Sequence, residues 1–567
     1  MEFKNFISVL LLSFLVSFEA PGGENVRPKK PAKPRQTIRN PQQMYPRRDG
    51  RMRQQQNPPA EQKAGLKPNV AYPYESDDQF KPVNKIDQLV LQELQKKNIK
   101  PANLCSDEVF IRRVYLDLTG NIPDPQEVRR FLSDERTGKR IILINSLLEK
   151  NEFADYSSLK WCDVLRVKAE FPINLWPNAV QAYHRWIRQA LLDNMPYDQF
   201  ARELLTSSGS NFRVPQVNFY RAVQGREPSS IAAAVALTFM GSRIESWAPS
   251  QRKGMEGFFS RITYKPTAEW KEEIVCLSAA PGEPLTAVFP DAKTVRIEPG
   301  TDPRAVFADW LIRPENQWFS KAIVNRIWSW VMGRGIIHEP DDIRPDNAPT
   351  NPELLAYLQE ELVKSKWDLR HVYKLILSSR TYQQSSIAQS DSPDVEKYFA
   401  VYPVRRLDAE VLIDVLCRIS GTKESYSSAI PEPFTFVPEE HRSIELADGS
   451  ITSQFLEMFG RPSRDTGLES ERNNLSSDAQ RLHLLNSTHV QNKIEKSWKL
   501  NGLVTAAKDN RKAIITMVYM NVLSRDPTAE EFKNAEAYFQ TEGIKSKDAV
   551  NDLVWALINS KEFLYRH

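Results

Sequence analysis

The sequence has no apolar run of eighteen residues and no motif of a common catalytic site. Its longest apolar run, at 6–18, is too short to cross a hydrocarbon core of about 30 Å. No G-x-S-x-G, Walker or G-x-G-x-x-G pattern occurs, so nucleophile-elbow hydrolases and the common nucleotide sites lack support. The seven histidines form no H-x-x-x-H or H-E-x-x-H pair, and we expect no metal site.

Cysteine is also scarce, with four residues and no C-x-x-C pair. Four cysteines allow three disulfide pairings, and the sequence does not choose among them for Cys105, Cys162, Cys276 and Cys417. We expect buried free thiols instead. Glycine (21 residues) is outnumbered by proline (38), an unusual ratio that indicates a proline-rich tail and many helices bounded by proline.

The N-terminal residues have the pattern of a signal peptide. Lys4 precedes the apolar run 6–18, whose thirteen residues are a typical length for the hydrophobic region of such a peptide. Ala20-Pro21-Gly22 offers small residues for cleavage. We therefore expect residues 1–22 to be a signal peptide and the protein to be exported to the periplasm or cell envelope. The alternative is an uncleaved anchor or a buried N-terminal strand.

Residues 23–82 are rich in Pro, Gln, Arg and Lys and lack apolar periodicity, which predicts a disordered linker. Within it, residues 24–74 hold twelve Lys/Arg and three Asp/Glu, a balance of +9, whereas residues 75–567 carry −4. Such a segment suits an anionic surface, and a solvated spacer is the alternative. Aromatic residues are sparse in it, so nucleic-acid binding is not expected.

The body from Val83 onward is predicted to be mainly α-helical. Apolar residues recur at helical spacing, and cap signals such as Asp124-Pro125, Asn351-Pro352 and Thr528 mark helix starts. Strand signals are confined to 286–289 and 294–297. The expected organisation is a two-part multi-helical body, with a helical domain at 83–262, a connector with short strands at 263–301 and a helical domain at 302–567.

Two long stretches resemble a pair of bacterial domains. Residues 84–262 contain RRVYLDLTGNIPDPQEVRRFL, YDQFARELLTSSG and NFYRAV, and resemble domain of unknown function 1549. Residues 302–565 contain AIVNRIWSWVMGRGIIHEPDDIRPDNAPTNPELLAYL and FGRPSRDTGLESERN, and resemble its usual companion, domain of unknown function 1553. The resemblance implies an exported, planctomycete-type protein, and it carries no established reaction.

The chain departs from that resemblance where cysteines are expected. Members commonly carry a C-x-x-C-H-type segment after the helix that here contains AAAVALTFMG, and a C-x-C after the Arg-Asp-Thr run at 464–466. Here the following residues are SRIESWAPSQ and GLES, without Cys or His. Covalent haem attachment needs two thiols and an axial histidine at fixed spacing, so we expect no haem cofactor.

The loop at 333–349 is the densest polar cluster of the sequence. Asp341 and Asp342 are the candidate catalytic residues, because adjacent carboxylates suit acid/base work or a hard cation, although the spacing matches no EF-hand. The candidate binding residues of the loop are His338, Arg344 and Asp346. The favoured alternative is that these side chains cap helices and pair with arginines.

Further candidate binding residues lie on either side of this loop. Arg326 and Trp328, on the preceding helix, suit a face that binds a sugar or an anion. The favoured alternative is a core tryptophan, with Arg326 paired to an aspartate of the loop. Arg461 and Arg464 form a candidate anion clamp, which we weigh below a structural role.

These features predict a non-catalytic envelope protein that acts as a binding or scaffold protein for a protein partner or a surface polysaccharide. The alternative is a periplasmic enzyme that acts on polysaccharide through the carboxylates of the 338–346 loop. Such an enzyme needs two carboxyl groups that face each other across a groove, roughly 5–9.5 Å apart.

Overall fold

The computed structural model describes residues 74–76, 78–279, 282–435, 437 and 440–567. The expected signal peptide and the linker through residue 73 lie outside the described residues. The body begins earlier than Val83. The hydroxyl of Tyr74 donates to Glu562 at 3.0 Å, and the backbone N–H of Ser76 donates to the carbonyl of Leu104 at 2.9 Å. The last part of the expected linker is therefore tied to the helical body.

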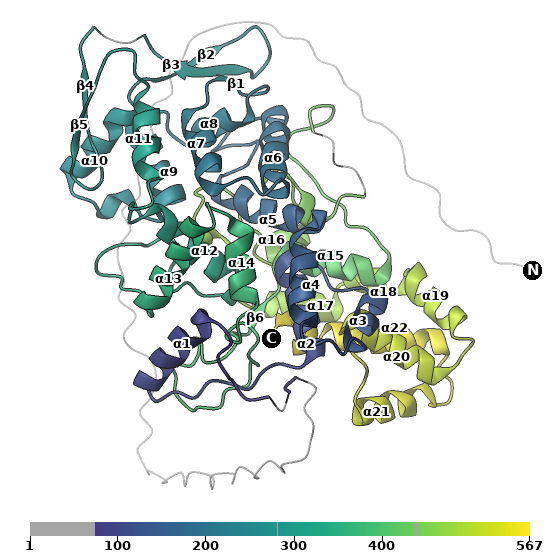
Figure 1. The fold of residues 1–567 in the computed structure, drawn as a ribbon. Coiled ribbons are helices and arrows are strands. Elements are labelled where there is room, and N and C mark those ends of the chain that lie inside the picture. The colour runs from purple at the N-terminus through teal and green to yellow at the C-terminus, as the bar shows by residue number, and fades with distance from the viewer. Residues whose placement is uncertain (1–73, 77, 280–281, 436, 438–439) are drawn as a thin grey trace, which may run out of the picture. The chain divides into compact units, whose positions relative to one another are not determined.

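Helices dominate the described chain, as the sequence predicted (Figure 1). Up to the connector they are α1 (Lys85–Lys96), α2 (Asp107–Thr119), α3 (Pro125–Leu132), α4 (Lys139–Leu148), α5 (Asn151–Val164), α6 (Pro177–Leu192), α7 (Tyr197–Thr206), η1 (Pro215–Val217), α8 (Asn218–Arg221), α9 (Pro228–Met240), η2 (Ile244–Ser246), α10 (Pro249–Glu256) and η3 (Gly257–Phe259). After it they are α11 (Pro303–Leu311), α12 (Phe319–Met332), α13 (Pro352–Lys364), α14 (Leu369–Leu377), α15 (Ala409–Ser420), η4 (Ser443–Glu445), α16 (Gln454–Met458), η5 (Glu469–Glu471), α17 (Asp478–Asn486), α18 (Thr488–Glu495), α19 (Trp498–Ala506), α20 (Arg511–Val522), α21 (Ala529–Phe539), α22 (Ser546–Ile558) and α23 (Lys561–Leu564).

The predicted cap residues start their helices. Asp124 accepts from the backbone of α3, and Glu127 reaches back to the N–H of Asp124, which completes a capping box. Asn351 caps α13 by accepting from Leu354, and Thr528 caps α21. Each cap satisfies a backbone N–H that has no partner within its helix. The boundaries of these helices are therefore set by local side chains.

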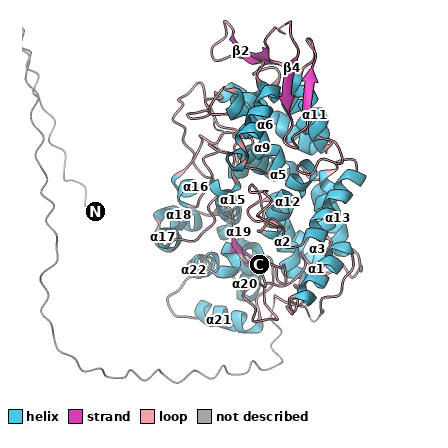
Figure 2. Cartoon of the chain, turned by 90° about the vertical axis from the view of Figure 1, so that its left-hand side faces the viewer, coloured by secondary structure: helices cyan, strands magenta, loops and turns pink. Residues whose placement is uncertain are grey.

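The connector folds into short strands. β4 (Leu285–Val288) and β5 (Thr294–Ile297) pair antiparallel, which confirms the predicted β element. The sequence did not signal β2 (Ile262–Pro266) and β3 (Glu273–Leu277), which form a sheet of order β1-β3-β2 with β1 (Gly209–Ser210). Their burial alternates weakly, so the period-2 pattern is faint. Both views place these strands at one end of the helical body (Figures 1 and 2).

A last pair of strands fixes the end of the described chain. β7 (Tyr565–Arg566) pairs antiparallel with β6 (Arg405–Arg406), and the N–H of Leu407 donates to the carbonyl of Leu564 at 3.0 Å. This pairing places Arg566 directly beside the residues that precede α15. It positions one wall of the charged site described below.

The buried apolar residues form two cores. Along the chain, the change from the first core to the second lies between residues 402 and 407 and not at the connector. A first core contains most of the buried apolar residues of 86–402, together with Ala447 and Met520, so α11–α14 pack with the first helical domain. A second core joins 407–563 to Leu116, Ile122, Tyr156 and Leu159. Helices α2 and α5 therefore contribute to both cores and lie along the seam between them. Among the described residues, none of the helices combines the length and apolar character needed to span a bilayer.

Candidate functional site

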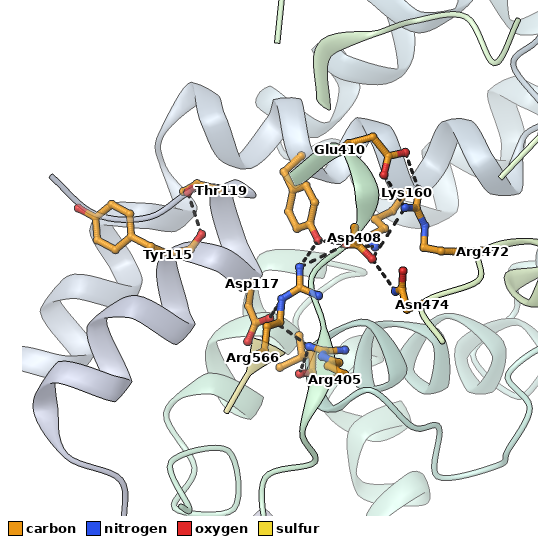
Figure 3. A network of polar contacts seen from close by, with 12 residues as sticks. Tyr115, Asp117, Thr119, Lys160, Arg405, Asp408, Glu410, Arg472, Asn474 and Arg566 are labelled. Carbon is orange, nitrogen blue, oxygen red and sulfur yellow. Dashed lines mark hydrogen bonds and ion pairs between the residues drawn. The ribbon is translucent and has the colours of Figure 1, made fainter. Parts of the chain in front are cut away.

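A network of buried charges occupies the seam between the two cores (Figure 3). Asp408, which is 1% exposed, lies at its centre. Its Oδ2 accepts from the hydroxyl of Tyr156 at 2.7 Å, from Nζ of Lys160 at 3.0 Å and from Nη2 of Arg566 at 3.2 Å. Its Oδ1 accepts from Nδ2 of Asn474 at 2.8 Å. One carboxylate thus joins α5, β7 and the segment after η5.

Further ion pairs extend the network in two directions. On one side, Arg472 contacts Glu410 at 2.7 Å and Asp163 at 2.6 Å. On the other, Asp117 of α2 contacts Arg405 at 3.0 Å and Arg566 at 3.2 Å. We call this set the seam network, and its members are Asp117, Tyr156, Lys160, Asp163, Arg405, Asp408, Glu410, Arg472, Asn474 and Arg566. Multiple partners offset the desolvation of each buried charge.

A pocket of about 230 Å³ opens beside the network, and we call it the Lys160 pocket. Residues that line it include Lys160, Trp330, His338, Glu469, Asn474 and Arg566. Within the described residues, Lys160 has one hydrogen-bond partner for its three N–H groups, and Oδ1 of Asn474 is buried without a partner. The amide of Asn474 is oriented by its donation to Asp408, so its oxygen is the atom left free. The pocket therefore holds both unused donors and an unused acceptor.

Burial and neighbouring charges shift the pKa values of the residues in this pocket, and the two influences often oppose each other. Burial lowers the pKa of Lys160, although Asp408 opposes that change. Burial raises the pKa of Glu469, and the charge of Asp341 adds to the rise. Burial alone would raise the pKa of Asp408, but Lys160, Arg566 and Arg472 hold it well below its usual range. Burial also lowers the pKa of His338. Charge on Lys160 and on Glu469 is thus disfavoured within one pocket.

Two known protein families match this chain, one in each of its two helical parts. The family described as "Protein of unknown function (DUF1549)" matches residues 85–247. The family described as "Protein of unknown function (DUF1553)" matches residues 303–539. The chain carries both of these domains. No curated protein and no solved structure matches it. Lys160 belongs to the DUF1549 domain, whereas Asp408, Glu469 and Asn474 belong to the DUF1553 domain, so the Lys160 pocket is built by both.

Asp341 of the DUF1553 domain does not serve as the free carboxylate that the sequence analysis considered. Its Oδ1 accepts from Nη2 of Arg326 at 2.7 Å, and its Oδ2 accepts from the backbone N–H of Glu469 at 2.6 Å. Arg326 also donates to the carbonyl of Thr238 at 2.9 Å, and both partners are buried. This is the pairing that the sequence analysis favoured for Arg326. It leaves neither residue exposed to a ligand.

Asp342 points away from Asp341, toward the surface of the loop. Arg344 contacts Asp342 at 3.2 Å and Asp346 at 3.4 Å, and all three side chains reach solvent. Asn347 donates to the carbonyl of Asp342 at 2.9 Å, which holds the loop closed on itself. The two neighbouring aspartates therefore do not form one acid/base pair. Of the residues singled out as binding candidates, His338 alone lines the Lys160 pocket.

The other candidate binding residues, Trp328, Arg461 and Arg464, are packed in the interior of the body. Trp328 is fully buried and stacks edge-on against Phe399 at 5.0 Å between ring centroids. Arg464 is fully buried, contacts Asp163 at 2.8 Å and donates to the carbonyl of Ala447 at 2.8 Å. The Arg461 side chain is buried as well and donates to backbone carbonyls. The proposed sugar face and anion clamp are corrected to structural roles.

Sequence reasoning missed the residues that form the Lys160 pocket. Lys160 is the single basic residue of α5. Asp408 and Arg566 are 158 positions apart. No spacing rule joins such residues before the fold is known. The signal that existed came from the family-like runs. Glu469 and Asn474 lie within or beside FGRPSRDTGLESERN, and Trp330 and the candidate His338 lie in the run that ends in NPELLAYL.

A larger hollow lies elsewhere, between α5, α6 and the segment around η4, with a volume of about 580 Å³. Its carboxylates are already paired, since Asp155 contacts Arg188 at 2.5 Å and Glu445 contacts Arg442 at 2.6 Å. We place the candidate site at the smaller Lys160 pocket because the unused polar atoms and the shifted acidities gather there.

The four cysteines form no disulfide bond with one another. The two segments in which the family-like cysteines are missing lie close together in the fold. Cys105, Cys162, Cys276 and Cys417 are all free thiols, and Cys105 and Cys162 are buried. Among described residues, no group of three or more His, Cys, Asp or Glu could hold a metal ion. The segments 243–245 and 465–468, both without Cys, line the same second pocket.

Proposed function

We propose that this chain is an exported cell-envelope protein that binds a sugar residue of a surface polysaccharide in the Lys160 pocket, without catalysing a reaction. The observation that carries the proposal is the mixture of unused polar atoms there. Lys160 offers N–H donors and Asn474 offers an acceptor. A sugar hydroxyl donates and accepts at once, so neighbouring hydroxyls match such a mixture.

The seam network supports the proposal by fixing the polar atoms in place. Lys160 and Asn474 are both held by Asp408. Trp330 adds an apolar wall, and its Nε1 donates to Glu469 at 3.1 Å, which orients the ring. Groups that are ordered before binding lose little entropy when a ligand arrives. A pocket of about 230 Å³ suits one sugar unit better than a folded partner.

Calorimetric titration with oligosaccharides released from the producing organism's envelope tests this proposal. Asn474→Ala removes the unused acceptor, and we expect it to weaken binding by about tenfold, the effect of one lost buried hydrogen bond. Lys253→Met, which removes an 82% exposed lysine, serves as the matched control and keeps full affinity. Unchanged affinity in Asn474→Ala would remove the pocket from consideration.

Export is proposed on the signal-like residues 1–22, and cell fractionation tests it. We expect the mature chain in the periplasmic or envelope fraction, with a new N-terminus near Ala20. Recovery of the full-length chain from the cytosol would contradict this part of the proposal. The basic segment 24–74 suits attachment to an anionic surface, which salt-dependent binding to anionic vesicles would reveal.

A second candidate function is a periplasmic enzyme that acts on polysaccharide. The raised pKa of Glu469 and the lowered pKa of Lys160 favour it, because both shifts are toward neutral pH, where a general acid or base works best. In this reading Glu469 replaces Asp341 as the acid. Release of reducing ends that is lost in Glu469→Gln would establish the enzyme. Binding without turnover in both forms supports the first proposal.

A further inference from the structure

Arg166 is a buried cation that forms no ion pair with a carboxylate of the described residues. It follows the C-terminus of α5, has a left-handed backbone (φ 56°) and is 3% exposed. Its Nε donates to the carbonyl of Ala222 at 2.7 Å, and its Nη1 reaches the carbonyls of Val164 at 3.4 Å and Thr466 at 3.5 Å. Within the described residues its Nη2 is buried without a hydrogen-bond partner. The guanidinium therefore keeps unused donor capacity.

No carboxylate within the described residues forms an ion pair with Arg166 at 4.0 Å or less. Glu471 is a carboxylate whose charge acts on Arg166 without direct contact. Its Oε1 accepts from the backbone N–H groups of Asp465 at 3.2 Å and Thr466 at 2.8 Å, and its Oε2 is buried without a hydrogen-bond partner within the described residues. Burial lowers the pKa of Arg166 to about 10. A buried cation is costly unless a counter-charge accompanies it, and the observed contacts leave the place of a direct counter-ion beside Arg166 open.

Arg166 lies on the wall of a pocket of about 430 Å³, which we call the Arg166 pocket. Its apolar wall comes from α9 and the two facing segments, namely Ala233, Ala234, Leu237, Ile244 and Leu468. At its rim, Asp465 contacts Lys168 at 2.7 Å and Arg243 contacts Glu339 at 3.0 Å, whereas Glu245 is exposed and forms no ion pair within the described residues. On the buried wall of the pocket the unused charge is that of Arg166, and it is positive.

We infer that the Arg166 pocket binds a small amphipathic carboxylate. The carboxylate accepts from Nη2 of Arg166, the nitrogen that has no hydrogen-bond partner within the described residues, and forms a charge-assisted hydrogen bond. The apolar body of the ligand lies along Ala233 and Leu237 of α9. An apolar pocket with one charged anchor is a common design for small-ligand sites. The pocket shares no lining residue with the Lys160 pocket, so this inference does not depend on the proposed function.

Thermal unfolding of the full chain with three probes tests the inference. Hexanoate carries both the charge and the apolar body, hexanamide has the body without the charge, and acetate has the charge with almost no body. We expect a saturable rise in Tm with hexanoate and no rise with hexanamide. Acetate should need at least a tenfold higher concentration to give the same rise in Tm. An equal rise with hexanamide would overturn the inference, because the charge would then play no part.

Two variants separate binding at this pocket from a general salt effect. Arg166→Met is expected to abolish the hexanoate response, whereas Arg213→Met, which removes an 84% exposed arginine, keeps it. Ala233→Leu retains Arg166 but fills the apolar wall, and it is expected to weaken hexanoate binding at least tenfold. If Arg166→Met fails to fold, Ala233→Leu alone tests whether hexanoate binds in the Arg166 pocket. A full response in either pocket variant would refute the assignment.

Discussion

Lys160 and Arg166 stand six positions apart at the end of α5, and both are shielded from solvent, yet their surroundings differ. Lys160 contacts Asp408 at 3.0 Å, and that carboxylate also binds Tyr156 and Arg566. Arg166 has backbone carbonyls as its hydrogen-bond partners. Lys160 belongs to a network in which buried charges of opposite sign pair with one another. Arg166 belongs to an arrangement that a ligand completes.

The difference matters for where binding energy comes from. In the seam network, the ion pairs hold the walls of the Lys160 pocket, and a ligand there uses only the atoms left over. In the Arg166 pocket, a ligand anion meets a desolvated guanidinium directly, where electrostatic attraction is stronger than in water. Charge in the seam network therefore contributes to rigidity, and charge at Arg166 contributes to affinity.

Removing the centre of the seam network should have the largest effect. Asp408→Asn keeps the shape of the side chain but leaves Lys160 and Arg566 without that carboxylate, and we expect the free energy of unfolding to fall by about 3–5 kcal/mol. Urea unfolding measures it. Asp346→Asn, at a 72% exposed side chain, is the control and should change little. A loss below about 1 kcal/mol would show that the network does not stabilise the seam.

A matched pair of arginine substitutions then sharpens the comparison. Arg472→Met removes the nearer cation from buried Glu410 and Asp163, which keep Arg461 at 3.6 Å and Arg464 at 2.8 Å, and we expect a loss of about 3 kcal/mol. Arg166→Met removes a charge that has no counter-ion, so relief of its desolvation offsets the lost carbonyl bond and the loss stays near 1 kcal/mol. Urea unfolding of both variants decides. Equal losses would mean that Arg166 is satisfied as it stands.

The contrast also explains what the sequence could predict. Helix starts at Asp124, Asn351 and Thr528 were predictable because a cap acts on residues two or three positions away. The pairing of Arg326 with Asp341 was also within reach, since fifteen residues and one helix end separate them. Local rules of capping and spacing thus recovered these helix starts and the pairing of the aspartates of the 338–346 loop with arginines.

The Lys160 pocket was beyond such rules. Lys160 and Asp408 are 248 positions apart, and they meet because α5 packs against both cores. The hairpin β2–β3 was missed for a related reason, because it pairs with β1 of the preceding domain. Contacts between distant segments depend on the packing of whole helices, which a local pattern of residue types does not encode.

Two aspartates near the start of α15 extend the comparison to pH. Cations hold the pKa of Asp408 well below its usual range, whereas burial raises the pKa of Asp414 to about 7, despite N–H donation from Ser443 and Ile444. The folded state then retains the proton of Asp414 while the unfolded state has lost it. Stability from Asp414 is full below about pH 4 and is lost as the pH rises toward 7.

We expect this loss to be about 2–4 kcal/mol and to disappear in Asp414→Asn, which cannot ionise. Urea unfolding between pH 4 and pH 7 measures the slope for wild type and variant. The stability contributed by Asp408 has the opposite sign, since it is present above the unfolded pKa and is lost only as the pH falls through its lowered folded pKa. An unchanged slope in Asp414→Asn would assign the pH dependence to another group.

The smallest effect is expected at the 338–346 loop. Asp342 and Arg344 form a solvent-exposed ion pair, and such pairs contribute about 0–1 kcal/mol. Asp342→Ala should therefore change the free energy of unfolding by less than about 0.5 kcal/mol and leave oligosaccharide binding at its wild-type value. Calorimetric titration of the variant beside Asn474→Ala makes the test. A tenfold loss of affinity in Asp342→Ala, with Asn474→Ala unaffected, would move the binding site from the seam to the surface of the loop.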